Sequence, residues 1–411
     1  MTRWLGAWAA LLSACNVTAQ SVSGGADLPE RGDCPRGVAV VSSDYVSSEV
    51  ALLFPSGKVA SRAFLSSASS AASGLAAAFS GDIVVDAAPS RPGELVIVDR
   101  FGTNVLTFVD SRTAAVRAQL PVGTGFEANA QQYVEVDERS AYVPRLGQNA
   151  APGREPFDAG SDLLVIDPSL PAVVGSVPLP RREGYLPAPS GVTQVGEDLL
   201  VTLQHARPDF SGMDDGELVG VSTLDRSIRY RLALRGSKNC GAVELSPSRK
   251  RLAVACEGYI DRKGAVLEPE TSGLLLLDPA QDPPAELQRF SAVELFDGPI
   301  QASLEFVSDE LLLVKTQTAQ GSSQDNRLFS LRLDSGEVTL LARAARDPNG
   351  AGFGIAFGGM SCASGCGDPC FVADMSRGQL LRFTLQGGAL APLDPVIVGG
   401  AGLPPTGVTT F

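Results

Sequence analysis

The amino-acid sequence predicts an all-β fold, a single β-propeller of seven four-stranded blades that the N-terminal strand closes. Three observations support this prediction: an abundance of turn residues, a recurring unit of four short strands, and a matching shortage of strands at the two ends of the chain. The 411 residues include 44 glycines and 28 prolines, which fits many tight turns better than long helices.

The clearest copy of the recurring unit covers residues 217–257. It contains four β-prone runs, and its second hairpin turns at residues 246–250, where Pro247 stands between two serines. A four-stranded unit of this length, when repeated, is typical of a propeller blade.

Comparable units can be traced along the chain, each assigned as an outer hairpin followed by two inner strands. The six complete units are 48–100, 105–145, 162–205, 217–257, 273–316 and 327–375. What remains is a hairpin over 379–398, a strand over 407–411 and, at the other end, a strand over 37–42. Joining these pieces completes one more blade and leaves no open sheet edge, so we expect seven blades rather than six or eight.

The strand rhythm, with turns such as Asp167-Pro168-Ser169 and Asp334-Ser335-Gly336, resembles that of the YVTN-type and lactonase-like seven-bladed propellers. No unit contains the Tyr-Val-Thr-Asn string of that group, so the resemblance is one of architecture. It covers nearly the whole mature chain and implies the fold, but a shared fold does not imply a shared activity.

The N-terminus has the pattern of an export signal. A short basic start is followed by an apolar run over residues 4–12 that is too short to span a bilayer. The run ends in Leu12-Ser13-Ala14-Cys15, which resembles the lipobox of bacterial lipoproteins, although an ordinary signal peptide is the alternative. The resemblance implies a signal peptide over 1–14 and a lipid on Cys15.

The expected lipoprotein would belong to the bacterial cell envelope. In lipoproteins an Asp after the lipidated Cys favours the inner membrane, and Asn16 stands here, so the outer membrane is the expected location. Residues 15–36 are rich in small and polar residues and are interpreted as a flexible tether to a propeller over 37–411. The lipid would be the membrane anchor.

The net charge of −13 argues against a nucleic-acid partner, because phosphate backbones attract basic surfaces. We expect a monomer with a protein or other envelope component as its partner.

The cysteines predict disulfides. If Cys15 carries a lipid, six of the seven cysteines remain, an even number in an oxidising compartment. Pairing Leu245 with Arg251 across the turn of unit 217–257 places Cys240 opposite Cys256, close enough to form a disulfide.

The other four cysteines are Cys34, Cys362, Cys366 and Cys370. A zinc site is the weaker interpretation, because the spacing is not that of paired C-x-x-C motifs and no histidine is near. We expect a disulfide from Cys34 to one of the other three and a local disulfide between the remaining two, and the pairing stays open. The tether would then enter on the face with these cysteines, and the opposite face would point away from the membrane.

On that opposite face, the polar residues at the ends of the inner strands are expected to surround the mouth of the channel. These residues are Asp44, Asp99, Arg100, Arg145, His205, Arg207, Glu257, Lys315 and Asp374. A concave ring of mixed charge can bind a ligand, whereas the alternative is that loop ends are polar because they are solvated.

A catalytic interpretation would use the carboxylates Asp99, Glu257 and Asp374 with His205 or Arg145. His205 is the one histidine of the chain, so a site with several histidine ligands is excluded. Acidic residues near it could hold Ca²⁺ through oxygen ligands, although an acidic surface loop explains them as well; they are Asp209, Asp214, Asp215 and Glu217.

Several enzyme classes lack their motifs in this chain. The sequence contains no C-x-x-C-H haem attachment motif, no G-x-S-x-G nucleophile elbow and no phosphate-binding loop. We therefore expect a lipid-anchored propeller that acts as a binding or scaffolding module, with no cofactor. The alternative is a lactonase-like hydrolase that uses the carboxylates at the channel mouth, with a divalent cation such as Ca²⁺.

Overall fold

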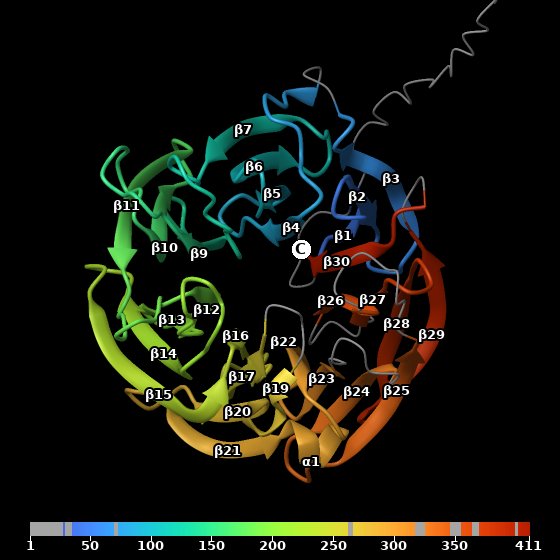
Figure 1. The fold of residues 1–411 in the computed structure, drawn as a ribbon. Helices are drawn as coiled ribbons and strands as arrows, with labels where there is room; N and C mark the ends of the chain where they lie inside the picture. The colour runs from blue at the N-terminus through green and yellow to red at the C-terminus, as the bar shows by residue number, and fades with distance from the viewer. Residues whose placement is uncertain are drawn as a thin grey trace, which may run out of the picture.

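The computed structural model of the protein describes residue 28 and residues 35–69, 73–261, 266–316, 325–345, 355–363, 370–398 and 402–411. Over these residues the chain forms seven four-stranded sheets, whose neighbouring strands are antiparallel, and one two-stranded sheet. The seven sheets are arranged around a central axis as the blades of a propeller (Figure 1), which confirms the predicted fold.

The blades are numbered along the chain, and each is given from its innermost to its outermost strand. Blade 1 consists of β4 (Ile83–Ala87), β5 (Glu94–Asp99), β6 (Val105–Asp110) and β7 (Val116–Pro121). Blade 2 consists of β8 (Val134–Asp137), β9 (Ser140–Gln148), β10 (Gly160–Asp167) and β11 (Ala172–Pro178). Blade 3 consists of β12 (Pro189–Val195), β13 (Asp198–Leu203), β14 (Asp215–Ser222) and β15 (Ile228–Lys238).

Blade 4 consists of β16 (Cys240–Leu245), β17 (Leu252–Cys256), β20 (Gly273–Asp278) and β21 (Ala285–Ser291). Blade 5 consists of β22 (Ile300–Ser308), β23 (Leu311–Thr316), β24 (Asn326–Arg332) and β25 (Val338–Ala344). Blade 6 consists of β26 (Phe357–Cys362), β27 (Cys370–Asp374), β28 (Gln379–Gln386) and β29 (Ala389–Ile397). The closing blade consists of β30 (Pro405–Thr410), β1 (Val38–Ser43), β2 (Ser48–Leu53) and β3 (Val59–Ser66).

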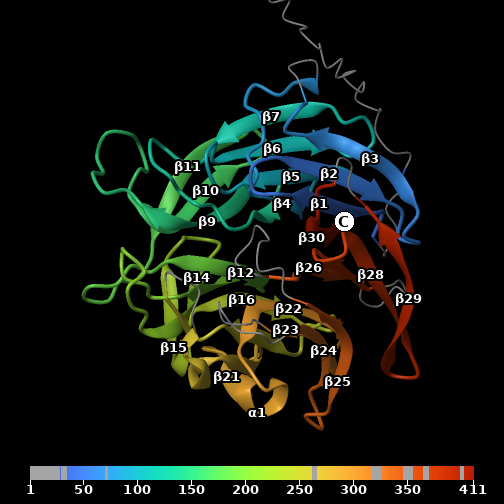
Figure 2. The same cartoon turned by 45° about the vertical axis from the view of Figure 1, so that its right-hand side comes forward.

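Burial follows the position of a strand within its blade. The middle strands are apolar runs buried on both faces, as in β17, where every residue is buried, because neighbouring blades cover both sides of the sheet. In the outermost strand β15, residues 228–233 alternate between partly buried and exposed. Figure 2 shows the strands of one blade following one another from the rim toward the centre, as β7, β6, β5 and β4 do.

The boundaries of the expected units differ from those of the blades. The innermost strand comes first in blades 1 to 6, whereas the sequence analysis placed an outer hairpin first. The unit 217–257 therefore spans two blades, with β14 and β15 in blade 3 and β16 and β17 in blade 4. A repeat of four strands has the same rhythm from any starting strand, so the pattern alone could not give the phase.

The ring closes by pairing the two ends of the propeller. Strand β30 pairs antiparallel with β1, and Val408 stands opposite Val40. The predicted pairing of residues 37–42 with 407–411 is therefore confirmed. The N-terminal part, however, contributes three strands to the closing blade rather than the expected one.

Side chains near the channel also connect neighbouring blades. At six of the seven junctions a polar side chain on or just before an innermost strand bonds to the backbone of the next such strand. These bonds are Thr409 to Val85 O (2.6 Å), Tyr133 N to Asp86 (2.8 Å), Val192 N to Gln132 (3.1 Å), Phe306 N to Glu244 (3.2 Å), Cys362 N to Glu305 (2.6 Å) and Thr410 N to Ser361 (3.0 Å). At the junction of blades 3 and 4, a Cβ on Gly191 would lie 2.8 Å from the carbonyl oxygen of Gly241, so the two backbones meet directly.

Two disulfides lie within the described residues. Cys240 and Cys256 form the predicted disulfide. Leu245 pairs with Leu252 rather than with Arg251, and a bulge between Cys240 and Ala242 restores the alignment of the cysteines. Cys362 and Cys370 form a local disulfide. Cys34 and Cys366 lie outside the described residues, so their expected pairing stays a prediction.

Helical structure is scarce in the part of the chain that the structure describes. It consists of the short helix α1 (Ala292–Phe296) and a 3₁₀ turn, η2 (Pro269–Thr271). A hairpin of β18 (Tyr259–Ile260) and β19 (Val266–Glu268) extends from blade 4. Within the described ranges no helix has the length and apolar character needed to cross a membrane. The predicted signal peptide and Cys15 lie outside these ranges.

Candidate functional site

One face of the propeller carries the ends of all second strands. In each blade the end of the second strand pairs with the start of the innermost strand, as Asp99 does with Ile83 and Asp374 with Phe357. The loops from the second to the third strand therefore lie on one face, here called the mouth face. The chain enters β1 on the opposite face, where Val38 pairs with Thr410 at the end of β30.

The residues predicted to surround the channel mouth lie at this face, but most of their side chains are buried. The exposed fractions are 1% for Asp99, 0% for Arg145, His205 and Asp374, and 3% for Lys315. Asp44 is exposed and accepts hydrogen bonds from the backbone of Val46 and Ser47. The side chains therefore do not form an open ring of charge.

Arg145 holds the loop between β9 and β10. Its Nε and Nη2 atoms donate to the two oxygens of Asp162, each at 2.7 Å, so the buried charge is paired. Nη2 also donates to the carbonyl oxygen of Phe157 at 2.6 Å, and Nη1 to the hydroxyl of Thr124 at 2.8 Å. The position of Phe157 thus depends on Arg145.

His205 has a similar role in blade 3. Its Nε2 atom lies 2.8 Å from Oε2 of Glu217, and Nε of Arg231 donates to Oε1 of Glu217 at 2.6 Å. Burial acts to raise the pKa of Glu217, but the hydrogen bonds from His205 and Arg231 outweigh it and lower the pKa to about 2. The carbonyl oxygen of His205 accepts from Asp214 N at 3.0 Å, which closes the loop that contains Phe210.

The remaining predicted carboxylates also have internal partners. Asp99 accepts from the backbone and the hydroxyl of Ser80 at 2.7 and 2.8 Å, and burial raises its pKa. Asp374 pairs with Arg377 at 2.9 Å. Glu257 accepts from Ala302 N at 3.0 Å, and burial raises its pKa.

Lys315 lies close to Glu257 and donates to the carbonyl oxygen of Phe357 at 3.4 Å and to that of Gly358. Burial lowers the pKa of Lys315 to about 7, although the charge of Glu257 opposes this change. Arg100 pairs with Asp82, and Arg207 lies 5.4 Å from the ring centre of Tyr185.

The acidic residues near His205 are engaged as well. Asp214 pairs with Arg182 at 2.9 Å, and Glu217 is held by His205 and Arg231. Within the described residues, no three His, Cys, Asp or Glu side chains come together as a set that could hold a metal ion.

The mouth face also carries four exposed aromatic side chains in successive blades. Tyr45, Phe101, Phe157 and Phe210 lie in the second-to-third-strand loops of the closing blade and of blades 1, 2 and 3, with exposed fractions of 40%, 60%, 41% and 40%. The sequence analysis missed them, although Tyr45 directly follows Asp44 and Phe101 directly follows Arg100. Exposed aromatic residues are typical of the centres of protein interfaces.

Three of these aromatics have a strained backbone. The φ angles of Tyr45, Phe157 and Phe210 are 64°, 58° and 55°, in the left-handed region that bulky residues rarely adopt. Such strain costs about 1–3 kcal/mol per residue and concentrates at functional sites. The bonds from Arg145 and His205 hold two of these loops in place.

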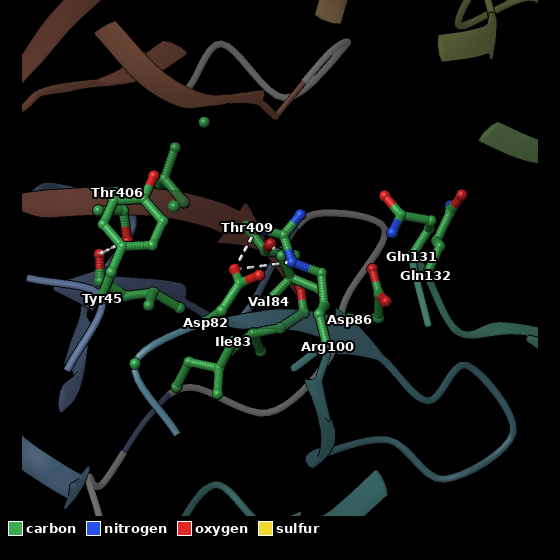
Figure 3. A pocket seen from close by; sticks show the side chains of 16 residues that line it. Tyr45, Asp82, Ile83, Val84, Asp86, Arg100, Gln131, Gln132, Thr406 and Thr409 are labelled. Carbon is green, nitrogen blue, oxygen red and sulfur yellow. Dashed lines mark hydrogen bonds and ion pairs between the residues drawn. The ribbon is translucent and has the colours of Figure 1, made fainter. Parts of the chain in front are cut away.

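A cavity of about 340 Å³ lies beside Tyr45, at the inner strands of the closing blade and of blades 1, 2 and 6. Figure 3 shows Tyr45 and Thr406 on one side, Gln131 and Gln132 on the other, and the Asp82–Arg100 ion pair between them. The lining residues combine polar and apolar groups; they are Val41, Tyr45, Gly81, Asp82, Ile83, Val84, Val85, Asp86, Arg100, Gln131, Gln132, Gly359, Thr406, Gly407, Val408 and Thr409. Of the predicted mouth residues, Arg100 lines this cavity.

Two further carboxylates lie on the innermost strands of blades 4 and 5. Glu244 and Glu305 contact solvent in part, yet protein surrounds them deeply enough for burial to dominate their ionisation. Burial raises the pKa of Glu244 to about 8. Burial and the nearby charge of Glu244 raise the pKa of Glu305 well above its ordinary value.

We predict that replacing both residues, Glu244→Gln with Glu305→Gln, makes the protein more stable at pH 8 relative to pH 5. Above the ordinary pKa of 4.5 the unfolded chain releases protons that the folded wild type keeps up to about pH 8, so wild-type stability falls across this range. The Gln carbonyls can still accept the hydrogen bonds from Phe306 and Cys362. Since one pKa unit corresponds to about 1.4 kcal/mol, the difference between variant and wild type should grow by at least about 1 kcal/mol over this range.

The measurement is urea unfolding of both proteins at intervals from pH 4 to pH 9. A wild-type curve parallel to that of the variant would show that these two carboxyl groups titrate normally and would contradict the prediction.

Comparisons with known proteins support the fold and go no further. No protein-family model and no curated protein matches the chain. A putative 6-phosphogluconolactonase from Bacteroides fragilis is similar in structure, with a TM-score of 0.54 and 10% identity over 91% of this chain and 98% of that one. The periplasmic gluconolactonase of Pseudomonas aeruginosa gives 0.55 and 14% identity over 91% and 98% of the two chains.

The hydrazine synthase of Kuenenia stuttgartiensis is also similar in structure, with a TM-score of 0.53 and 14% identity over 79% of this chain and 87% of that one. At identities this low the likeness concerns the fold alone. The chain is thus a seven-bladed β-propeller whose structural neighbours include lactonase-like propellers.

Proposed function

We propose that this protein is a lipid-anchored β-propeller of the bacterial envelope that binds a protein partner through its mouth face. The observation that carries the proposal is the row of exposed aromatics, one in each of four successive blades, on strained loops of a single face. Large aromatic side chains supply much of the binding energy of protein interfaces, and a rigid loop loses little entropy on binding.

The orientation of the chain is consistent with this role. The anchor would be a lipid on Cys15, joined to the propeller by the tether over 15–36. Because the chain enters β1 on the face opposite the mouth, an anchored propeller would present its mouth face away from the membrane. The Asn at position 16 favours the outer membrane as the site of anchoring.

We predict that the double variant Phe157→Asn with Phe210→Asn loses its partner without losing stability. Asn tolerates the left-handed backbone at both positions better than Phe does, so the fold should melt at the same or a higher temperature. Removing two central aromatics typically costs an interface about 2 kcal/mol or more for each, which would abolish a complex of micromolar affinity. The measurement is chemical cross-linking in native envelopes, with recovery of the propeller and quantification of its partner.

The matched control lies in the same two blades on the opposite face. Leu170 and Leu224, in the turns that end β10 and β14, are 72% and 74% exposed. The variant Leu170→Asn with Leu224→Asn should recover the partner as the wild type does. Equal recovery by all three proteins, or a loss confined to the control, would overturn the proposal.

The alternative function is hydrolysis of a lactone. Its support is the fold likeness to lactonase-like propellers, which at 10–14% identity does not extend to activity. Its candidate carboxylates Asp99, Glu257 and Asp374 are held by internal hydrogen bonds or ion pairs, so a substrate would have to displace these partners.

We predict that millimolar Ca²⁺ leaves the melting temperature unchanged and that δ-gluconolactone is hydrolysed no faster with the protein than in buffer. The propeller without its signal peptide would be melted with and without Ca²⁺, and lactone hydrolysis would be followed by acid release. A rise in melting temperature with Ca²⁺, or turnover that Asp99→Ala or Glu257→Ala abolishes, would favour the hydrolase instead.

A further inference from the structure

We propose that the cavity beside Tyr45 binds a small organic cation that carries several hydroxyl groups, such as an amino-polyol. This proposal does not depend on the protein partner of the mouth face. It rests on the size of the cavity, on its lining and on the position of one carboxylate.

The cavity is built to be open and polar. Its volume of about 340 Å³ falls in the range of small-molecule sites. Gly81, Gly359 and Gly407 leave room where other residues would project a side chain, and a Cβ on Gly81 would overlap the backbone of Tyr45.

The hydrogen-bonding groups come from several elements. The hydroxyls of Thr406 and Thr409 belong to β30, and the amides of Gln131 and Gln132 precede β8 (Figure 3). Valine and isoleucine side chains complete the lining. Mixed hydroxyl, amide and aliphatic groups match a polyol, whose hydroxyls alternate with C–H groups.

The charge of the cavity selects a cation. Arg100 is already neutralised by Asp82, because its Nε and Nη2 atoms both donate to Oδ1 of that residue. Asp86 accepts a hydrogen bond from Tyr133 N at 2.8 Å, and among the described residues no lysine or arginine forms an ion pair with it. Asp82, Arg100 and Asp86 together therefore give the cavity one net negative charge when Asp86 is ionised.

The ionisation of Asp86 supports this assignment. Burial raises its pKa to about 7, although the bond from Tyr133 acts in the opposite direction. A partly desolvated carboxylate without a cationic partner is unfavourable, and a bound ammonium group would supply the missing charge. The other charged groups around this position are Asp82, Arg100 and, on β8, Glu135, which accepts from Ser90 and Tyr133.

Three linear six-carbon polyols test the proposal: glucamine, sorbitol and gluconate. They share a carbon chain and differ in charge, since glucamine is a cation, sorbitol is neutral and gluconate is an anion. Calorimetric titration at pH 8 should show glucamine binding about tenfold or more tightly than sorbitol, as one charge-assisted hydrogen bond implies. Gluconate should bind more weakly than either.

Two variants locate the site. Asp86→Asn keeps an oxygen that can accept from Tyr133 N, and it should reduce the preference for glucamine over sorbitol to less than about threefold while the melting temperature stays near that of the wild type. Glu244→Gln is the matched control, because Glu244 makes the same kind of bond between blades but does not line the cavity. It should bind glucamine as the wild type does.

The outcomes separate this proposal from the others. Tighter binding of gluconate, an unchanged glucamine preference in Asp86→Asn, or an equal loss in Glu244→Gln would overturn it. Displacement of glucamine by Ca²⁺ in an Asp86-dependent way would make the cavity a metal site and would overturn it as well. The cross-linking of the partner at Phe157 and Phe210 would be unaffected by any of these results.

Discussion

The pairing of β30 with β1 is the interaction on which the rest of the structure depends. It converts a row of sheets into a ring, because one antiparallel ladder satisfies the edges that the two chain ends would otherwise leave open. Each innermost strand then meets the next through a side-chain bond or, at Gly191 and Gly241, through the backbone itself. The cavity lies where β30 meets β4, so it exists only in the closed ring.

Buried polar groups connect this ring to the loops of the mouth face. Arg145 and His205 are each paired with a carboxylate, which offsets the cost of burying their polar groups, and each also holds the backbone of a loop that carries an exposed aromatic. The strain in these loops is therefore balanced by bonds inside the blades. A rigid surface results, in which function would come from the aromatic side chains and stability from the polar groups beneath them.

The sequence was sufficient for the fold and for part of the site. Strand rhythm and the shortage at the two ends predicted the ring and its closing pair, and hairpin geometry predicted the disulfide of Cys240 with Cys256 although a bulge shifts the register by one residue. The phase of the blades could not be predicted, because a four-strand repeat has no marked beginning. Asp86 was missed because a polar residue on an innermost strand resembles any solvated position until the neighbouring blades surround it.

The central claim is that the mouth face is the working surface of the propeller, and site-specific photo-cross-linking in intact cells tests it most directly. A photoreactive amino acid would replace Phe101, Phe157 or Phe210 on the mouth face, or Leu170 or Leu224 on the opposite face. The account predicts one discrete cross-linked species from the three mouth positions and none from the other two. Cross-links to a single partner from Leu170 or Leu224, with none from the aromatic positions, would contradict it.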